Sequence, residues 1–99
     1  MVALLNADDV EAGLGKLNGW TGDTSEIRRS YSAPDFPTAI RLVDAVAVAA
    51  EEMNHHPDID IRWRTVHFTI STHSEGGVTG LDLELAGRVD AAAESLGAV

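Results

Sequence analysis

A change of hydrophobic period in the second half of the chain limits the possible folds more than any other feature. From residue 36 to residue 54 the apolar side chains recur with the 3.6-residue period of a helix. From residue 58 to residue 72 the period becomes two, which is typical of strands with one buried and one polar face. A change of phase at Arg64-Thr65 predicts a tight turn between two antiparallel strands.

The predicted helix at residues 36–54 has a clear start and an unusually wide apolar surface. Asp35 precedes it as a helix cap, and Pro37 falls early enough in the first turn to be tolerated. The apolar stripe consists of Phe36, Ala39, Ile40, Val43, Val46, Ala47, Ala50 and Met53, and Leu42, Ala45, Val48 and Ala49 widen it. The pattern favours a central core helix, and the alternative is a helix partly covered by a second subunit.

The remaining elements complete a single α+β domain over residues 1–99. A short helix capped by Asn6 or Asp8 ends at Asn18-Gly19, and two short strands follow, with Trp20 as a core anchor. A last helix opens at residues 79–82. The order helix, two strands, helix, two strands, helix predicts a four-stranded antiparallel sheet with three helices packed on one face.

Composition argues against several classes of partner and site. The 99 residues carry a formal net charge of −9 and contain no cysteine, so a phosphate backbone would be repelled and neither disulfides nor thiolate ligands are available. We expect no nucleic-acid partner. No stretch reaches the about 18 to 20 apolar residues of a membrane span, and no basic region precedes the first apolar run. These features predict a cytoplasmic protein without a membrane partner.

Three of the four histidines belong to one short motif. Imidazole ionises near neutral pH, so grouped histidines point to proton transfer. The motif is Glu51-x3-His55-His56-Pro57-x5-Trp63-x9-His73-x8-Asp82, with Asp35-Phe36-x2-Ala39 and Gly19-Trp20 upstream. This arrangement closely resembles the signature of the pterin-4a-carbinolamine dehydratase family, over most of the chain from Trp20 to Ala86.

The resemblance implies a hydro-lyase that breaks a carbon–oxygen bond. Such an enzyme removes water from 4a-hydroxytetrahydropterin to give quinonoid dihydropterin, and so recycles tetrahydrobiopterin-type cofactors. On the family pattern His55 and His73 are the acid and the base, in an order that spacing does not decide, and His56 mainly holds the pterin. The resemblance implies neither a metal nor an organic cofactor, and a homodimer or homotetramer.

Two acidic residues of the motif have structural as well as functional interpretations. Glu51 lies one turn before His55, where it is expected to accept a hydrogen bond from that imidazole and to help bind the substrate. Without the motif, Glu51 is a solvated helix residue. Asp82 is the third residue after Thr79, so it is expected to complete a capping box in a structural or supporting role.

Two further side chains, Trp63 and His67, can each have either a structural or a functional role. Trp63 is a candidate substrate-binding residue by its place in the motif, although burial beside Ile59 and Ile61 is favoured over stacking on a pterin. His67 lies outside the motif on the same polar strand face as His73. A solvated or hydrogen-bonded structural role is favoured for His67.

Two other classes of function remain as alternatives. One is a non-catalytic protein-binding module, because the family resemblance extends to a protein that stabilises a dimer of a transcription factor through helical surfaces. The other is a metal hydrolase with Glu51, His55, His56 and His73 as ligands. Adjacent histidines at a helix end point in different directions, so the metal site ranks last.

Overall fold

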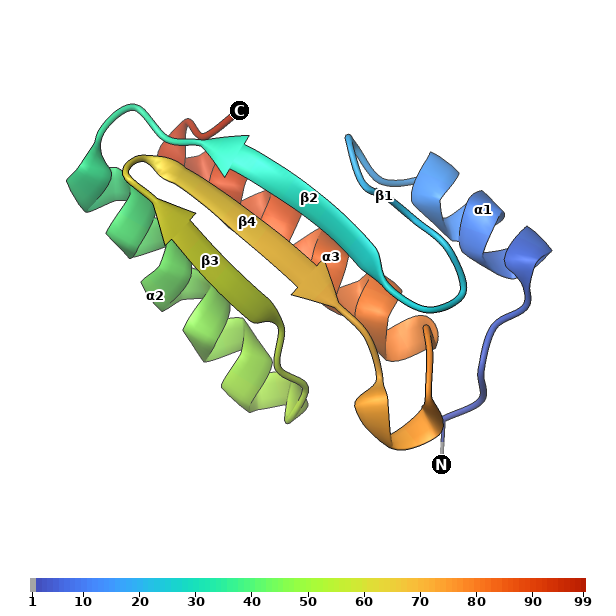
Figure 1. Cartoon of the computed structure of the whole chain (residues 1–99). Coiled ribbons are helices and arrows are strands. Elements are labelled where there is room, and N and C mark those ends of the chain that lie inside the picture. The colour runs from blue at the N-terminus through green and yellow to red at the C-terminus, as the bar shows by residue number, and fades with distance from the viewer. Residues whose placement is uncertain (1) are drawn as a thin grey trace.

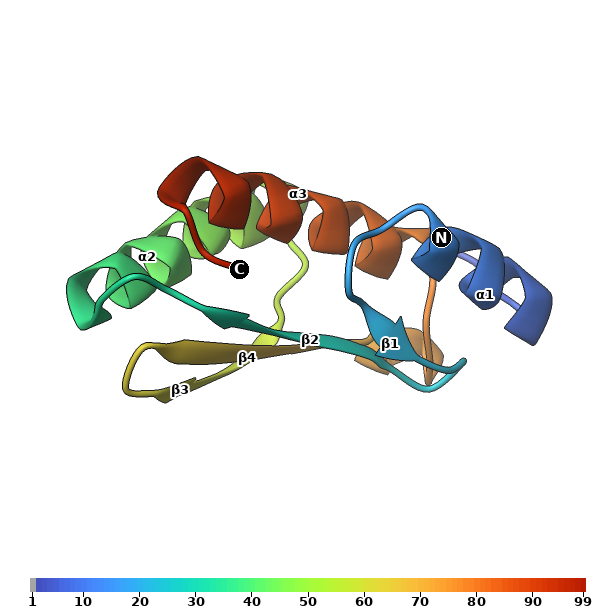
Figure 2. The ribbon, with the colours of Figure 1, turned by 90° about the horizontal axis from the view of Figure 1, so that it is seen from above.

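The computed structural model describes residues 2–99 and shows one antiparallel sheet covered by helices on one face (Figures 1 and 2). The elements are α1 (Ala7–Gly15), β1 (Thr21–Gly22), β2 (Ile27–Ser32), α2 (Phe36–Met53), β3 (Asp58–Arg62), β4 (Thr65–Ile70), a short 3-10 helix η1 (His73–Glu75) and α3 (Gly80–Leu96). The strands lie in the order β1-β2-β4-β3. The predicted α+β class and its order of helices and strands are confirmed.

Strands β2 and β4 form the centre of the sheet, paired from Ile27–Ile70 to Ser32–Thr65. Alternation along them turns every second side chain toward the helices, and most of these are buried. Among them are Tyr31 and Phe68, whose rings meet edge to face at 6.0 Å. The opposite face of the sheet carries polar side chains, such as Ser30 and His67. No helix covers that face (Figure 2). Trp20 is 5% exposed and belongs to the core, as predicted.

Helix α2 begins and ends where its caps place it. Asp35 accepts a hydrogen bond from the Thr38 N–H at 2.8 Å, and the helix ends at Asn54, which adopts a positive φ of 49°. Leu42 and Val46 are buried, whereas other apolar side chains of the helix stay exposed. Those exposed side chains are Phe36, Ile40 and Val48. The helix is therefore a core helix on one face and uncovered on the other.

The β3–β4 hairpin differs from the prediction by one residue. Its two-residue turn is Trp63-Arg64, and Thr65 already belongs to β4. Trp63 takes a positive φ of 55° and its side chain is 73% exposed, so the favoured burial beside Ile59 and Ile61 was wrong. The register decides this, because Arg62 pairs with Thr65 and leaves only two residues for the loop.

Strand β4 is also shorter than the alternation of residues predicted. It ends at Ile70, and His73 starts the 3-10 helix η1 instead of ending the strand. Within residues 2–99 no helix has both the length and the apolar character needed to cross a membrane. A cytoplasmic location stays a prediction of the sequence.

Candidate functional site

His55 and His73 lie at the same end of the sheet. Helix α2 leads through His55 into β3, whose first residue, Asp58, pairs with Thr69 near the end of β4. The chain leaving β4 then enters η1 at His73. Because β3 and β4 are antiparallel, the chain runs away from His55 along β3 and comes back along β4 to His73 (Figure 1).

His55 is held by the end of α2 and by Asp82. Its N–H donates to the Ala50 carbonyl at 3.0 Å, a bond that closes the last turn of the helix. Its side chain is nearly buried, and its Nε2 lies 2.6 Å from Asp82 Oδ1. The sequence predicted that Glu51 would accept this hydrogen bond, and that prediction was wrong. The partner comes instead from the first turn of α3, 27 residues away along the chain.

Asp82 is fully buried and accepts three hydrogen bonds. Its Oδ2 accepts from the Thr79 N–H at 2.7 Å and from the Thr72 hydroxyl at 2.8 Å, while its Oδ1 faces His55. The predicted capping box is confirmed, since Thr79 is the cap of α3 and Asp82 its third residue. The same carboxylate thus caps a helix and orients an imidazole. The positive end of the helix dipole also favours its negative charge.

This arrangement leaves one nitrogen of His55 available. An ionised carboxylate can only accept, so the ring nitrogen that faces Asp82 carries the hydrogen. The Nδ1 atom has no hydrogen-bond partner among residues 2–99, where every buried polar side-chain atom has one. Nδ1 is therefore not completely buried. In the neutral ring it is a proton acceptor, and in imidazolium it is a proton donor.

His56 and Glu51 form a separate pair at the surface. His56 Nε2 lies 2.5 Å from Glu51 Oε2, and the two side chains are 56% and 77% exposed. Both residues stay open to a ligand. The contact joins the last turn of α2 to the segment that follows it. Glu51 therefore orients the second histidine of the tandem and not the first.

His73 is exposed and begins η1 directly after the buried Thr72. The turn closes when the Gly76 N–H donates to the His73 carbonyl at 3.2 Å, with Gly76 at a positive φ of 78°. Because the Thr72 hydroxyl reaches Asp82, the segment that carries His73 is tied to the carboxylate that holds His55. Sequence reasoning missed Thr72, since a threonine in an alternating strand gives no signal of its own.

Two predicted or considered residues lie elsewhere. Trp63 sits at the tip of the hairpin, at the opposite end of β3 from His56. A five-residue strand spans roughly 16 Å, so its place gives the predicted substrate contact no support within one chain. His67 accepts or donates a 2.5 Å hydrogen bond to Ser30 on the uncovered sheet face, in line with the structural role favoured for it.

The described residues offer no ready metal site. Within residues 2–99, no group of three or more histidine, aspartate and glutamate side chains is placed to hold a metal ion. Glu51, His55, His56 and His73 divide between a surface pair, a buried pair and a separate turn. The metal-hydrolase alternative therefore finds no ligand set in this geometry.

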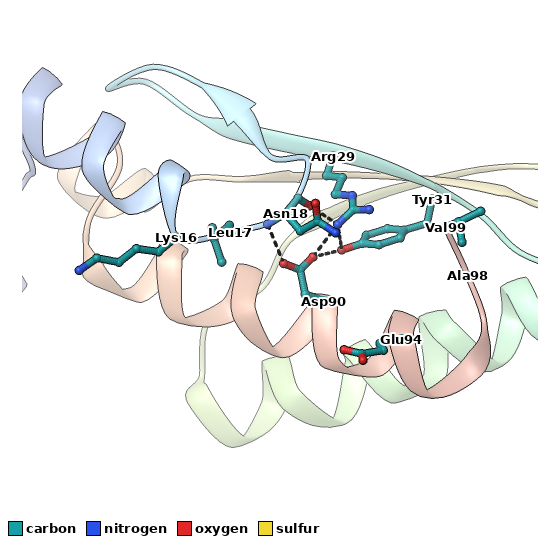
Figure 3. A pocket seen from close by; sticks show the side chains of 9 residues that line it. All are labelled: Lys16, Leu17, Asn18, Arg29, Tyr31, Asp90, Glu94, Ala98 and Val99. Atoms are coloured by element: carbon teal, nitrogen blue, oxygen red, sulfur yellow. Dashed lines mark hydrogen bonds and ion pairs between the residues drawn. The ribbon is translucent and has the colours of Figure 1, made fainter.

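A second polar cluster ties the sheet to α3 away from the histidines. Asp90 of α3 accepts hydrogen bonds from Arg29 at 3.0 Å and from Tyr31 (Figure 3). It also accepts one from Trp20 at 2.8 Å. Burial, and then the hydrogen bond to Asp90, raise the pKa of Tyr31 far above its ordinary range. A cavity of about 560 Å³ lies beside this cluster, and none of the three motif histidines lines it. Arg29 and Asp90 form an ion pair between β2 and α3. These contacts hold the helix against the sheet and indicate a structural role.

Comparison with known proteins agrees with the motif. The family model described as pterin 4 alpha carbinolamine dehydratase matches residues 3–92. The chain belongs to the pterin-4-alpha-carbinolamine dehydratase family. A relative named for this family in Roseiflexus castenholzii is 52% identical over 90 residues, covering 91% of this chain and 97% of the relative. Another, in Nocardia farcinica, is 55% identical over 87 residues, covering 88% and 92%.

A solved structure extends the family likeness to three dimensions. The crystal structure of a transcriptional coactivator/pterin dehydratase from Brucella melitensis matches with a TM-score of 0.89 and 34% sequence identity. The match covers 92% of this chain and 99% of that one. The pterin-4-alpha-carbinolamine dehydratase fold therefore accounts for nearly the whole chain, with no large addition or loss.

Proposed function

We propose that this protein dehydrates 4a-hydroxytetrahydropterin to quinonoid dihydropterin by histidine general acid–base catalysis. The observation that carries the proposal is the buried His55–Asp82 pair, joined through Thr72 to the turn that begins at His73, in a chain of the dehydratase family. In this role the protein would be a hydro-lyase that recycles tetrahydrobiopterin-type cofactors.

The chemistry requires two proton transfers. The C4a–O bond breaks and hydroxide leaves as water once an acid supplies a proton. A base removes the proton from N5, and the electron pair of that N–H forms the C4a=N5 double bond. The two histidines then hold opposite protonation states before and after turnover. Each such transfer is typically worth ~10² to 10⁴ in rate.

Within this scheme the residues take different roles. His55 exchanges its proton at Nδ1, because Asp82 occupies Nε2. His73 is exposed at the start of its turn and serves as the second acid–base group. His56 and Glu51, paired at the surface, hold the pterin. Asp82 supports His55 and does not meet the substrate, since it is fully buried.

The direct test is a turnover assay on the purified protein. We expect it to accelerate the dehydration of 4a-hydroxytetrahydropterin above the spontaneous rate without added metal, and equally after treatment with a chelator. The rate should depend on pH through histidine ionisation, because one histidine must be protonated and the other neutral. Stopped-flow absorbance follows the product. A folded protein that leaves the spontaneous rate unchanged would refute the proposed activity.

A protein-binding role is the second candidate, and the exposed face of α2 favours it. Phe36 is 47% exposed, Ile40 36% and Val48 60%, and Phe36 and Ile40 lie one turn apart on the same side of the helix. A partner that covered this side would bury apolar surface. The Brucella relative's title names a coactivator as well as a dehydratase. Loss of turnover without loss of a cellular phenotype, on replacing His55 and His73, would favour binding over catalysis.

The same surface supports the predicted homodimer or homotetramer. We expect light scattering to give a mass that is a multiple of the 10.5 kDa chain, and Ile40→Glu to lower it, because a buried unpaired charge opposes association. Ser95→Glu, on the exposed side of α3, is the matched control and should leave the mass unchanged. A wild type that is already monomeric at micromolar concentration would contradict the expectation.

A further inference from the structure

We propose that Thr72 is a positioning residue for His55, acting through Asp82; the inference rests on the function proposed above. Thr72 is buried, 4% exposed, and its Oγ1 lies 2.8 Å from Asp82 Oδ2. The other oxygen of the same carboxylate holds His55 at 2.6 Å. One side chain thus lies between the loop of the second histidine and the orienting partner of the first.

The hydrogen bonds around Thr72 have a single consistent direction. The Thr79 hydroxyl accepts from the Leu81 N–H at 3.2 Å, which leaves its own hydrogen for Thr72 Oγ1 at 2.8 Å. Thr72 in turn donates to Asp82. Both carboxylate oxygens are therefore engaged, and the carboxylate cannot rotate without losing a buried hydrogen bond. An unmade hydrogen bond of a buried group is costly.

The backbone of Thr72 also fixes the turn that carries His73. Its carbonyl accepts from the N–H groups of Glu75 and Gly76, each at 3.0 Å, and its own N–H donates to the Gly77 carbonyl at 3.0 Å. The side chain and the backbone of Thr72 therefore act on different histidines. The side chain sets the ring orientation and the tautomer of His55, while the backbone sets the place of His73.

Two substitutions of Thr72, one that removes the hydroxyl and one that keeps it, separate these roles. Thr72→Val keeps the shape and the backbone bonds but removes both the donor to Asp82 and the acceptor for the Thr79 hydroxyl. We expect kcat to fall about tenfold, with KM nearly unchanged, because the charge-assisted hydrogen bond to Asp82 is lost. Thr72→Ser restores the donor and should recover most of kcat. Thr69→Val, in the neighbouring strand β4, is the matched control, because its hydroxyl makes no hydrogen bond among residues 2–99. It should leave kcat unchanged.

Nitrogen-15 NMR of the histidine rings provides a measurement that does not depend on turnover. In the wild type and in Thr72→Ser we expect His55 as the Nε2–H tautomer, with its signal assigned by its loss in His55→Asn. In Thr72→Val the ring should become a mixture of tautomers, and the pH profile of kcat should shift. A merely structural role would lower stability but leave the tautomer and the profile unchanged.

The two measurements separate failure of this inference from failure of the proposed function. If the tautomer changes in Thr72→Val but no variant, nor the wild type, turns over the pterin, the positioning role stands and the dehydratase assignment fails. If the wild type is active while Thr72→Val keeps its kcat, pH profile and His55 tautomer, the positioning role is overturned. Circular dichroism confirms that each variant is folded.

Discussion

His73→Ala and His55→Ala are each expected to lower kcat by ~10² to 10⁴, because each removes one of the two proton transfers in the dehydration. His73 is exposed, so its loss should leave stability unchanged. His55 is nearly buried and bonded to Asp82, so its loss should also destabilise the fold. Stopped-flow turnover at saturating substrate, with thermal unfolding measured alongside, separates the two effects.

A matched control and a double variant sharpen this expectation. His67→Ala removes the fourth histidine, which contacts Ser30 on the uncovered sheet face, and should leave kcat unchanged. The double variant of His55 and His73 should lose little more than the worse single variant, because residues that act as a unit are not additive. If both single variants were folded and fully active, the acid–base roles of His55 and His73 would be refuted, even for a member of this family.

Asp82→Ala should give the largest loss of stability of any single substitution considered, about 3 to 5 kcal/mol of unfolding free energy, as when one partner of a buried charged pair is removed. Three donors lose their acceptor together: His55, Thr72 and the Thr79 N–H. Since small domains are stable by only about 5 to 15 kcal/mol, such a variant would be close to unfolding at room temperature. Urea denaturation measures the loss directly.

Asp82→Asn tests whether the charge or the shape matters. An amide oxygen that still accepts from the Thr79 N–H and the Thr72 hydroxyl leaves the amide NH2, a donor, facing His55 Nε2. We expect a smaller loss of stability than in the alanine variant, together with a clear loss of kcat, because a donor facing Nε2 favours the opposite tautomer of His55. Asp60→Ala, an exposed carboxylate on β3, is the control, expected within about 0.5 kcal/mol of the wild type. An alanine variant as stable as this control would contradict the buried network.

Local pattern predicted the elements of this fold well. The period of 3.6 before His56 and the period of two after it correspond to α2 and to the β3–β4 hairpin. Asp35 and Thr79 begin their helices because each side chain accepts from an N–H two or three residues ahead. These signals depend on neighbours in the chain, and so a single sequence contains them.

The boundaries of the hairpin depended on the register between its two strands. The turn falls at Trp63-Arg64 because the pairing of β3 with β4 fixes which residues remain unpaired. A shift of one position turned Trp63 from an expected buried side chain into an exposed one. Register is a property of two strands together, so alternation within one strand does not determine it.

Signals from residues close together in the chain were enough to predict the α+β class, the helix caps and the motif histidines. The partners of those histidines could be assigned only from the folded chain. They are Asp82 for His55 and Glu51 for His56, with Thr72 bonded to the other side of Asp82. The packing of the end of α2 against the start of α3 brings together side chains 27 residues apart. No period or spacing encodes that contact, since hydrogen bonds form between groups that the folded chain places within reach.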